Sequence, residues 1–225
     1  MKSLEERKII VERYTPRARR TIFSAKYIAR QTGSWEIETE HLLLGLLKED
    51  QSLARRFLGS PWALDEVWGQ VSQSIPAPEE PAGTFDLKLS TVNKRVLAFA
   101  AEEAERLSNR HIGTEHLLLG LLREEKCFAA EMLHQRGVHL EAIREELIRT
   151  RHDDSAQERF VRESTSLPEV VELQILLKPT TDRVEDALAG HDWMKANRYA
   201  DEERTTRDKL YLLCRQHGLS DWLYD

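Results

Sequence analysis

Residues 39–48 read Thr-Glu-His-Leu-Leu-Leu-Gly-Leu-Leu-Lys, and residues 114–123 carry the same letters except for an arginine in the last place. That single exchange keeps the positive charge. The two stretches are 75 residues apart, and the same offset aligns positions 15–37 with positions 90–112 without a gap. Recurrence of a long motif at a constant offset indicates two copies of one structural unit.

Each copy has residues that are typical of helix beginnings. Thr15 precedes Pro16, the arrangement of an N-cap followed by proline at the first helical position, and Ser90 is an equivalent cap in the second copy. Thr39 and Thr114 are predicted to cap the next helix. That helix carries a glutamate in its first turn, where the helix dipole favours an anion.

The leucine-rich motif is predicted to form the second helix of each copy. Leu43, Leu46 and Leu47 fall on one face at helical spacing. Gly45 and its counterpart Gly120 lie in the middle of this helix, where glycine costs about 1 kcal/mol relative to alanine. We interpret both glycines as points at which a neighbouring helix packs closely.

Two shorter helices are predicted to complete each copy, near residues 53–58 and 64–72 in the first and near residues 129–135 and 140–149 in the second. Gly137 is expected to stop the helix that precedes it. The predicted fold class is therefore all-α, with two four-helix repeats related by a pseudo-twofold axis and followed by a helical hairpin.

Two stretches of linker composition divide the chain. Residues 75–83 are rich in proline, and residues 150–167 are polar and aperiodic. Beyond them Pro179 is expected to break or kink a helical run, and residues 190–192 are expected to form a tight turn. The predicted segments are, in order, an N-terminal extension 1–14, a duplicated domain 15–150 with repeat one 15–73, a linker 74–86 and repeat two 87–150, a second linker 151–167 and a hairpin 168–225.

The composition limits the classes of function. The chain has 39 acidic and 33 basic residues, a formal net charge of −6, so nucleic acid is not an expected partner. No secretory signal is expected. The most apolar stretches, such as residues 42–47, are too short to span a bilayer, so no membrane association is expected. Cys127 and Cys214 are the two cysteines and lie far apart, which predicts no disulfide and a cytoplasmic location.

Residues 15–150 resemble the double repeat at the N-terminus of the ClpA/ClpC group of AAA+ unfoldases. The resemblance is carried by Tyr14 to Ala18 and by Ile112 to Leu121. In that family this region receives adaptors and substrates, and in one branch it binds phosphorylated arginine. The sequence contains no G-x-x-x-x-G-K-[ST] loop, so the ATPase of such unfoldases is not expected here. Residues 168–225 are similar to the UvrB/UvrC-type helical hairpin, over Ala187 to Ala196.

The resemblance implies two phosphoarginine sites, one in each repeat. Each site would combine a residue at the start of the first helix with the glutamate of the leucine-rich motif. Carried over to this chain, the pairs are Thr15 with Glu40 and Ser90 with Glu115. A helix N-terminus with a hydroxyl group suits a phosphate, and a carboxylate suits a guanidinium. The alternative is that these four residues are ordinary N-caps and first-turn acids.

The two implied sites differ in the residue before the threonine of the motif. Glu38 stands where the family has glycine, whereas Gly113 keeps the glycine. The added carboxylate beside Glu40 attracts a guanidinium and repels a phosphate. We therefore predict that the site with Glu115 accepts phosphate better than the site with Glu40. Trp35 is expected at the edge of the latter site.

No other group of residues points to catalysis or to a cofactor. The sequence has no H-E-x-x-H and no paired C-x-x-C, so no metal site is expected. His41 and His116 follow the two glutamates, and a shared packing or hydrogen-bonding role explains them better than a metal or catalytic role. Cys127 has no histidine partner at a suitable spacing and is interpreted as structural.

The sequence therefore predicts a non-catalytic module that binds protein partners and needs no cofactor. The expected partners are a Clp unfoldase, an adaptor or a substrate protein, with phosphoarginine as the candidate ligand. One alternative is a module linked to nucleic acid or repair through the C-terminal hairpin. The other is an enzyme of unknown class, for which the sequence offers no nucleophile–base pair, metal set or cofactor loop.

Overall fold

The computed structural model describes residues 13–58, 63–74, 87–151, 167–189 and 193–217. The chain divides into two compact units, residues 1–148 and 149–225, which we describe separately. Most of the predicted extension, most of both predicted linkers and the predicted turn at 190–192 lie outside the described residues.

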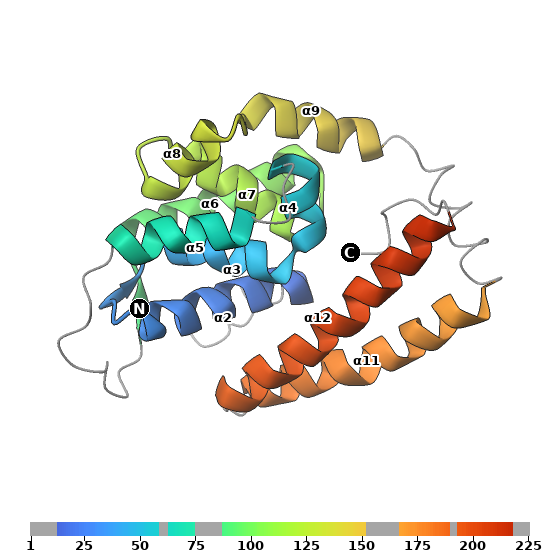
Figure 1. The fold of residues 1–225 in the computed structure, drawn as a ribbon. Helices are drawn as coiled ribbons and strands as arrows, with labels where there is room; N and C mark the ends of the chain where they lie inside the picture. Colours follow the sequence, from blue (N-terminus) through green and yellow to red (C-terminus); the bar gives the residue numbers. More distant parts are fainter. Residues whose placement is uncertain (1–12, 59–62, 75–86, 152–166, 190–192, 218–225) are drawn as a thin grey trace. The chain divides into compact units, whose positions relative to one another are not determined.

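The first unit contains two sets of four helices (Figure 1). The two sets confirm the predicted all-α class and the duplicated four-helix repeats, with boundaries within two residues of those expected for the shorter helices. Repeat one consists of α2 (Pro16–Gln31), α3 (Thr39–Glu49), α4 (Gln51–Leu58) and α5 (Ala63–Ser74), and repeat two of α6 (Thr91–Arg106), α7 (Thr114–Arg123), α8 (Phe128–Gln135) and α9 (Leu140–Arg151).

Short extended segments join the repeats to each other in a reciprocal way. β1 (Glu36–Ile37) pairs in parallel with β2 (Lys88–Leu89), and Tyr14 forms a parallel bridge with Ile112. The repeat offset converts one pairing into the other. The segment before the first helix of each repeat therefore pairs with the segment before the second helix of the other repeat. Two-residue strands are too short to produce a period-2 pattern, so the sequence did not predict them.

The leucine-rich helices α3 and α7 lie at the centre of the unit. The leucines from Leu42 to Leu47, and their counterparts in α7, are all at most 1% exposed. These helices are thus buried on all sides, not on the single face that their spacing predicted. A Cβ at Gly45 would lie 2.5 Å from the carbonyl oxygen of Thr21 in α2, and a Cβ at Gly120 would lie 2.5 Å from that of Val96 in α6. The close helix packing that we predicted for both glycines is confirmed.

The first helices are capped as predicted, and the second helices are capped in another way. The hydroxyl of Thr15 accepts the Ala18 N–H at 3.2 Å, and that of Ser90 accepts the Asn93 N–H at 3.1 Å. Thr39 and Thr114, however, are the first residues of their helices and not the caps. The cap positions are occupied by the preceding residues, Glu38 and Gly113.

The reason for this shift is a histidine at the third position of each second helix. Nδ1 of His41 accepts the backbone N–H of Glu38, and Nδ1 of His116 accepts that of Gly113, each at 2.9 Å. The side chain reaches back from the helix to the cap residue, so no cap hydroxyl is needed. The hydrogen-bonding role predicted for both histidines is confirmed.

The first helix of each repeat ends at a residue in the left-handed region. Gly33 has φ 70° in repeat one, and Ser108 has φ 54° at the corresponding place in repeat two. Both are part of the same turn, because Ser34 N–H donates to Ala29 O and Asn109 N–H donates to Ala104 O. Gly137, with φ 76°, follows the end of α8 and confirms the predicted helix stop.

The second unit is a hairpin of α11 (Pro168–Ala189) and α12 (Trp193–Gln216). Its small core contains Val170, Leu210 and Cys214.

Pro179 lies inside α11, so of the expected break or kink, the break does not occur. Proline removes the N–H that would bond to the carbonyl of Ile175, and the neighbouring threonine hydroxyls bond to other carbonyls of this turn. The Thr180 hydroxyl donates to the carbonyl of Leu177 at 2.6 Å, and the Thr181 hydroxyl donates to the same oxygen at 3.1 Å. The same Thr181 hydroxyl lies 2.9 Å from the carboxylate of the buried Glu203 of α12, so the two acceptors share its single hydrogen.

The glycine contacts give a stability prediction with an internal control. Gly45→Ala and Gly120→Ala should each lower the free energy of unfolding by about 1–3 kcal/mol, because the new methyl group meets backbone atoms that side-chain motion cannot move. Gly69 of α5 has open space around the same position, so Gly69→Ala should gain up to about 1 kcal/mol from helix propensity. Urea unfolding followed by circular dichroism measures all three. Stabilisation by Gly45→Ala or Gly120→Ala would contradict the packing.

Candidate functional site

The reciprocal pairing creates two related surfaces at helix N-termini. We call residues 35–40 with residues 88–90 the Glu40 site, and residues 110–115 with residues 13–15 the Glu115 site. Each combines the start of a second helix from one repeat with the start of a first helix from the other.

Backbone hydrogen bonds hold each of these combinations together. The N–H of Ser90 donates to the carbonyl of Ile37 at 3.1 Å, and the N–H of Thr15 donates to the carbonyl of Ile112 at 3.0 Å. In the first combination the amide nitrogen of Asn93 donates to the same Ile37 oxygen at 2.7 Å. Ser90 therefore lies beside the segment that leads to Glu40, and Thr15 beside the segment that leads to Glu115. The pairing of Thr15 with Glu40 and of Ser90 with Glu115 within one repeat remains a prediction.

The carboxylate of Glu115 turns back over Gly113. A Cβ at position 113 would lie 2.3 Å from both carboxylate oxygens, so glycine is what makes room for this conformation. Oε1 of Glu115 is also 2.8 Å from Nδ1 of the buried His116. The Glu115 carboxylate thus lies over the N-terminus of α7, at the end of the segment that the Thr15–Ile112 backbone hydrogen bond joins to α2.

Glu40 has a different environment, because the residue at the cap position is Glu38. Burial raises the pKa of Glu40, and the charge of Glu38 adds to the rise, while hydrogen bonds from its own backbone and from Thr39 oppose it. The Thr39 hydroxyl donates to the Glu40 carboxylate at 3.4 Å. The two glutamates occupy the same place in the repeated motif but are held by different contacts.

The two histidines are also held differently at their far ring nitrogen. Nε2 of His41 is 3.2 Å from the hydroxyls of both Thr32 and Ser34. Nε2 of His116 is buried and has no hydrogen-bond partner within the described part of the chain. Burial lowers the pKa of His41 to about 4. His41 is therefore neutral near pH 7 and serves as a structural acceptor.

The threonines of the two motifs reach across to the other repeat. The Thr114 hydroxyl donates to Oδ2 of Asp50 at 2.6 Å, and Arg17 donates to the same oxygen at 3.2 Å. Oδ1 of Asp50 accepts the Leu53 N–H at 2.9 Å near the start of α4. Asp50 was not predicted from the sequence, although an aspartate directly before a predicted helix is a typical cap.

Cys127 has the corresponding position in repeat two. It is the N-cap of α8, and its sulfur accepts the Ala130 N–H at 3.4 Å. Thr39 forms a hydrogen bond with the thiol, and burial is the main reason that the pKa of Cys127 is raised. A buried thiol with a raised pKa is a poor nucleophile, in agreement with the structural interpretation of this cysteine.

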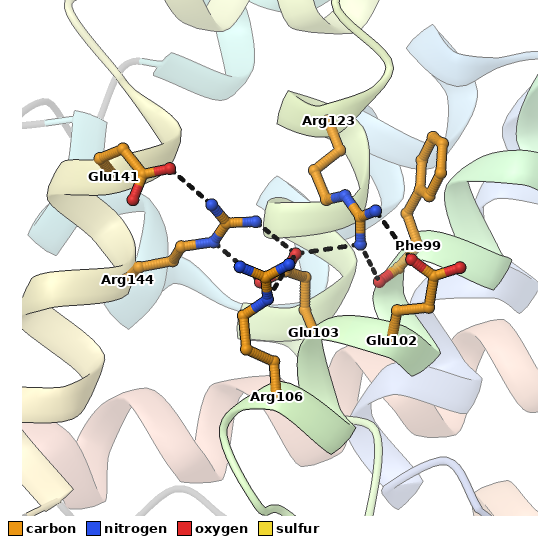
Figure 2. A network of polar contacts seen from close by, with 7 residues as sticks. All are labelled: Phe99, Glu102, Glu103, Arg106, Arg123, Glu141 and Arg144. Carbon is orange, nitrogen blue, oxygen red and sulfur yellow. Dashed lines mark hydrogen bonds and ion pairs between the residues drawn. The ribbon is translucent and has the colours of Figure 1, made fainter.

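A second polar network in this unit was not predicted at all. Glu103 of α6 is completely buried, and three arginines converge on its carboxylate (Figure 2). Arg144 of α9 donates to it from Nε at 2.9 Å and from Nη2 at 2.5 Å, Arg123 of α7 donates at 3.0 Å, and Arg106 lies 4.0 Å away. Burial opposes ionisation of Glu103, but the arginines outweigh it and hold its pKa below the usual value.

This network is peculiar to repeat two. Arg123 also pairs with Glu102 at 2.7 Å and stacks on Phe99, with its guanidinium carbon 4.3 Å from the ring centre. In repeat one the position of Glu103 is taken by Ile28, the thirteenth residue of the first helix, which is 4% exposed. The position of Arg144, the fifth residue of the last helix, is taken by Val67, which is 1% exposed. One repeat thus uses apolar residues where the other uses an ion pair.

The described residues give no sign of a metal centre or a membrane span. None of their histidine, cysteine, aspartate and glutamate side chains gather in groups of three or more that could hold a metal ion. None of the helices in the described ranges combines the length and the apolar character needed to cross a bilayer.

Comparison with known families also finds a repeat domain in this chain. The profile of the Clp repeat (R) N-terminal domain matches residues 13–134 and again residues 88–186. The chain belongs to this family. The resemblance noted in the sequence is therefore confirmed for the duplicated domain. The similarity of residues 168–225 to the UvrB/UvrC-type hairpin remains a prediction.

Several large proteins contain a similar Clp repeat domain. The chain is 32% identical over 137 residues to the negative regulator of genetic competence ClpC/MecB of Bacillus subtilis, a match that covers 60% of this chain and 17% of that protein. It is 31% identical over 146 residues to the chaperone protein ClpB of Oceanobacillus iheyensis, covering 64% of this chain and 18% of that protein. The matched region spans less than a fifth of these relatives.

Solved structures show the same Clp repeat fold. The N-terminal domain of the caseinolytic protease-associated chaperone ClpD from Arabidopsis thaliana is 30% identical, with a TM-score of 0.51, and the match covers 63% of this chain and 99% of that one. The Hsp104 N-terminal domain from Candida albicans is 18% identical, with a TM-score of 0.51 and coverage of 61% and 91%, and shows the fold alone.

The low pKa of His41 predicts a pH dependence of stability. The folded pKa of about 4 lies below the ordinary value of 6.5, so the unfolded chain binds the extra proton between these values and stability falls as the pH falls from 6.5 to 4. The loss from this one group is about 3 kcal/mol at the lower end. His41→Asn, whose side-chain oxygen replaces Nδ1 as acceptor, should show a smaller loss over the same range. Urea unfolding across this range measures both proteins, and an unchanged pH slope in the variant would refute the assignment.

The Glu103 network gives a prediction for exchanging residues between repeats. Glu103→Ile alone leaves Arg123 and Arg144 with only their exposed acidic partners, Glu102 and Glu141. Arg144→Val alone removes the main donor, so each change should cost about 3 kcal/mol of unfolding free energy. Glu103→Ile with Arg144→Val installs the residues of repeat one and should cost far less than the sum. Urea unfolding of the three variants completes the double-mutant cycle. Additive losses would show that the pair is not coupled.

Proposed function

We propose that this Clp repeat protein is a receptor for proteins that carry phosphoarginine, which it presents to a Clp unfoldase. In this proposal the Glu115 site is the principal binding place. The Glu115 carboxylate receives the guanidinium, and the N-terminus of α2 at Thr15 receives the phosphate.

The observation that carries the proposal is the backbone link between Thr15 and Ile112. It brings the positive end of a 16-residue helix next to a carboxylate that glycine allows to fold back over the N-terminus of α7. A helix N-terminus binds phosphate through its free N–H groups and its dipole. A carboxylate binds a guanidinium through charge-assisted, often bidentate, hydrogen bonds. Phosphoarginine carries both groups on one side chain.

This arrangement changes the proposed partners of each glutamate. The carried-over pairs joined residues of the same repeat, whereas the backbone links favour Thr15 with Glu115 and Ser90 with Glu40. The ranking of the two sites is unaffected, because it depends on Glu38 and Gly113, which flank the glutamates directly.

The relatives support a Clp unfoldase as the kind of partner with which this chain acts. A protein of Staphylococcus epidermidis that is 34% identical over 138 residues is an ATP-dependent Clp protease ATP-binding subunit ClpC. A domain shared with such a subunit is suited to recognising the same substrates or adaptors, and we propose that this chain acts beside an unfoldase of that kind. The hairpin of α11 and α12 would supply a helical surface for such a partner.

Calorimetric titration with phosphoarginine, with arginine as the comparison ligand, tests the proposal. We expect saturable binding of phosphoarginine that Glu115→Ala reduces at least tenfold, about 1.4 kcal/mol, because the charge-assisted bonds to the guanidinium are lost. Glu40→Ala should have a smaller effect. Glu131→Ala, which removes an exposed acid of α8, is the matched control and should leave binding unchanged.

A double-mutant cycle decides which cap belongs to which glutamate. Thr15→Ala and Glu115→Ala should be coupled in phosphoarginine binding, whereas Ser90→Ala and Glu115→Ala should be additive. Thermal unfolding checks that the cap variants stay folded, because loss of an N-cap hydroxyl costs about 1 kcal/mol. Coupling of Ser90 with Glu115 would restore the pairing within one repeat. Absence of phosphoarginine binding would refute the receptor function.

A further inference from the structure

The two sites have the same backbone frame and opposite charge. Lys88 in the Glu40 site corresponds to Arg13 in the Glu115 site, so the short strand contributes one cation to each. The difference lies in the loop before the second helix. There the residues 35, 36 and 38 of one site correspond to the residues 110, 111 and 113 of the other.

At each of these three positions the Glu40 site is more negative by one formal charge. Trp35 corresponds to Arg110 of the other site. Glu36 corresponds to His111, which counts as neutral in the formal charge, and Glu38 corresponds to Gly113. Within the described part of the chain, no arginine or lysine forms an ion pair with Glu36, Glu38 or Glu40. Three carboxylates within residues 36–40 repel one another, and a bound cation relieves this repulsion.

Trp35 is a second and independent indication of a ligand. Its side chain is 88% exposed, the highest value among the large apolar residues described. An exposed indole beside carboxylates is a platform for a guanidinium, which stacks on the ring while it pairs with the acids. A phosphate group would meet the carboxylates instead and be repelled.

Asn93 adds a buried acceptor behind the same loop. Its amide nitrogen donates to the carbonyl of Ile37, which lies between Glu36 and Glu38 in the chain. The oxygen of the same amide is buried and has no hydrogen-bond partner among the residues described. The Asn93 amide thus fixes the backbone of the loop that carries Glu36 and Glu38.

We infer that the Glu40 site binds an unphosphorylated arginine side chain of a protein partner, so that the two sites of one molecule recognise two states of the same residue. The inference rests on the proposed function, because it gives the second site of that receptor its own ligand. Trp35 provides the stacking surface, and Glu38 with Glu40 provides the carboxylates.

The test uses two peptides of identical sequence, one with arginine and one with phosphoarginine at its centre. Each is titrated into the full chain by calorimetry, with tryptophan fluorescence as a second readout. We expect the arginine peptide to bind one place and the phosphorylated peptide another, without competition. Trp35→Ala and Glu38→Gly should each weaken the arginine peptide by about fivefold or more. Trp68→Ala, which removes another exposed tryptophan, is the matched control and should change neither affinity.

A charge exchange between the sites sharpens the test. Trp35→Arg with Glu36→His and Glu38→Gly installs the repeat-two residues in repeat one. This variant should lose the arginine peptide and gain a second equivalent of the phosphorylated peptide. Because Trp35 and Glu36 are exposed, the fold should be retained, and thermal unfolding verifies this.

The outcomes separate this inference from the proposed function. The inference would be overturned if binding of the arginine peptide did not saturate, or if its affinity were unchanged by Trp35→Ala and Glu38→Gly. Competition between the arginine peptide and the phosphorylated peptide would also overturn it. Loss of phosphorylated-peptide binding in Glu115→Ala would still support the receptor function in that case. If Glu115→Ala left the affinity for the phosphorylated peptide unchanged, the proposed function itself would be overturned. Binding of the arginine peptide that depends on Trp35 would remain valid in that case.

Discussion

The reciprocal backbone hydrogen bonds between the two repeats are the interaction on which the rest of the first unit depends. These bonds join the beginning of the first helix of one repeat to the segment before the second helix of the other repeat. In one of them the Thr15 N–H donates to Ile112 O, and in the other the Ser90 N–H donates to Ile37 O. The central helices α3 and α7 are buried on all sides only because the helices of both repeats surround them. The cross-repeat contact of Thr114 with Asp50 follows from the same placement.

Much of this architecture could be predicted from the sequence. The fixed offset predicted the duplication, and the cap residues Thr15 and Ser90 predicted where the first helices begin. The helical glycines predicted the close approach of neighbouring helices, because glycine is costly in a helix unless something needs its space. These features are local, and local chemistry decides them.

The features that could not be predicted depend on which residues meet across the repeats. Thr39 was taken for a cap because threonine usually is one, whereas the histidine two positions later takes over that role. Glu103 lies on the buried face of a helix, and the sequence does not say that Arg123 and Arg144 from two other helices will surround it. Pro179 lies inside a helix, and the contact of Thr181 with Glu203 of the partner helix beside it is another feature that the sequence does not show. The pairing of caps with glutamates across repeats is likewise a consequence of topology.

The reciprocal pairing also bears on how such a domain arises. Because each site takes half of its residues from either repeat, a chain with a single repeat would contain neither site in complete form. Two copies of such a chain, related by a twofold axis, would contain both, since an isologous interface presents the same surfaces twice. Fusion of the two copies into one polypeptide removes the requirement that the halves be identical. A symmetric dimer of identical chains cannot have different residues at equivalent positions. This chain has Ile28 in repeat one where repeat two has Glu103, and Glu38 where repeat two has Gly113.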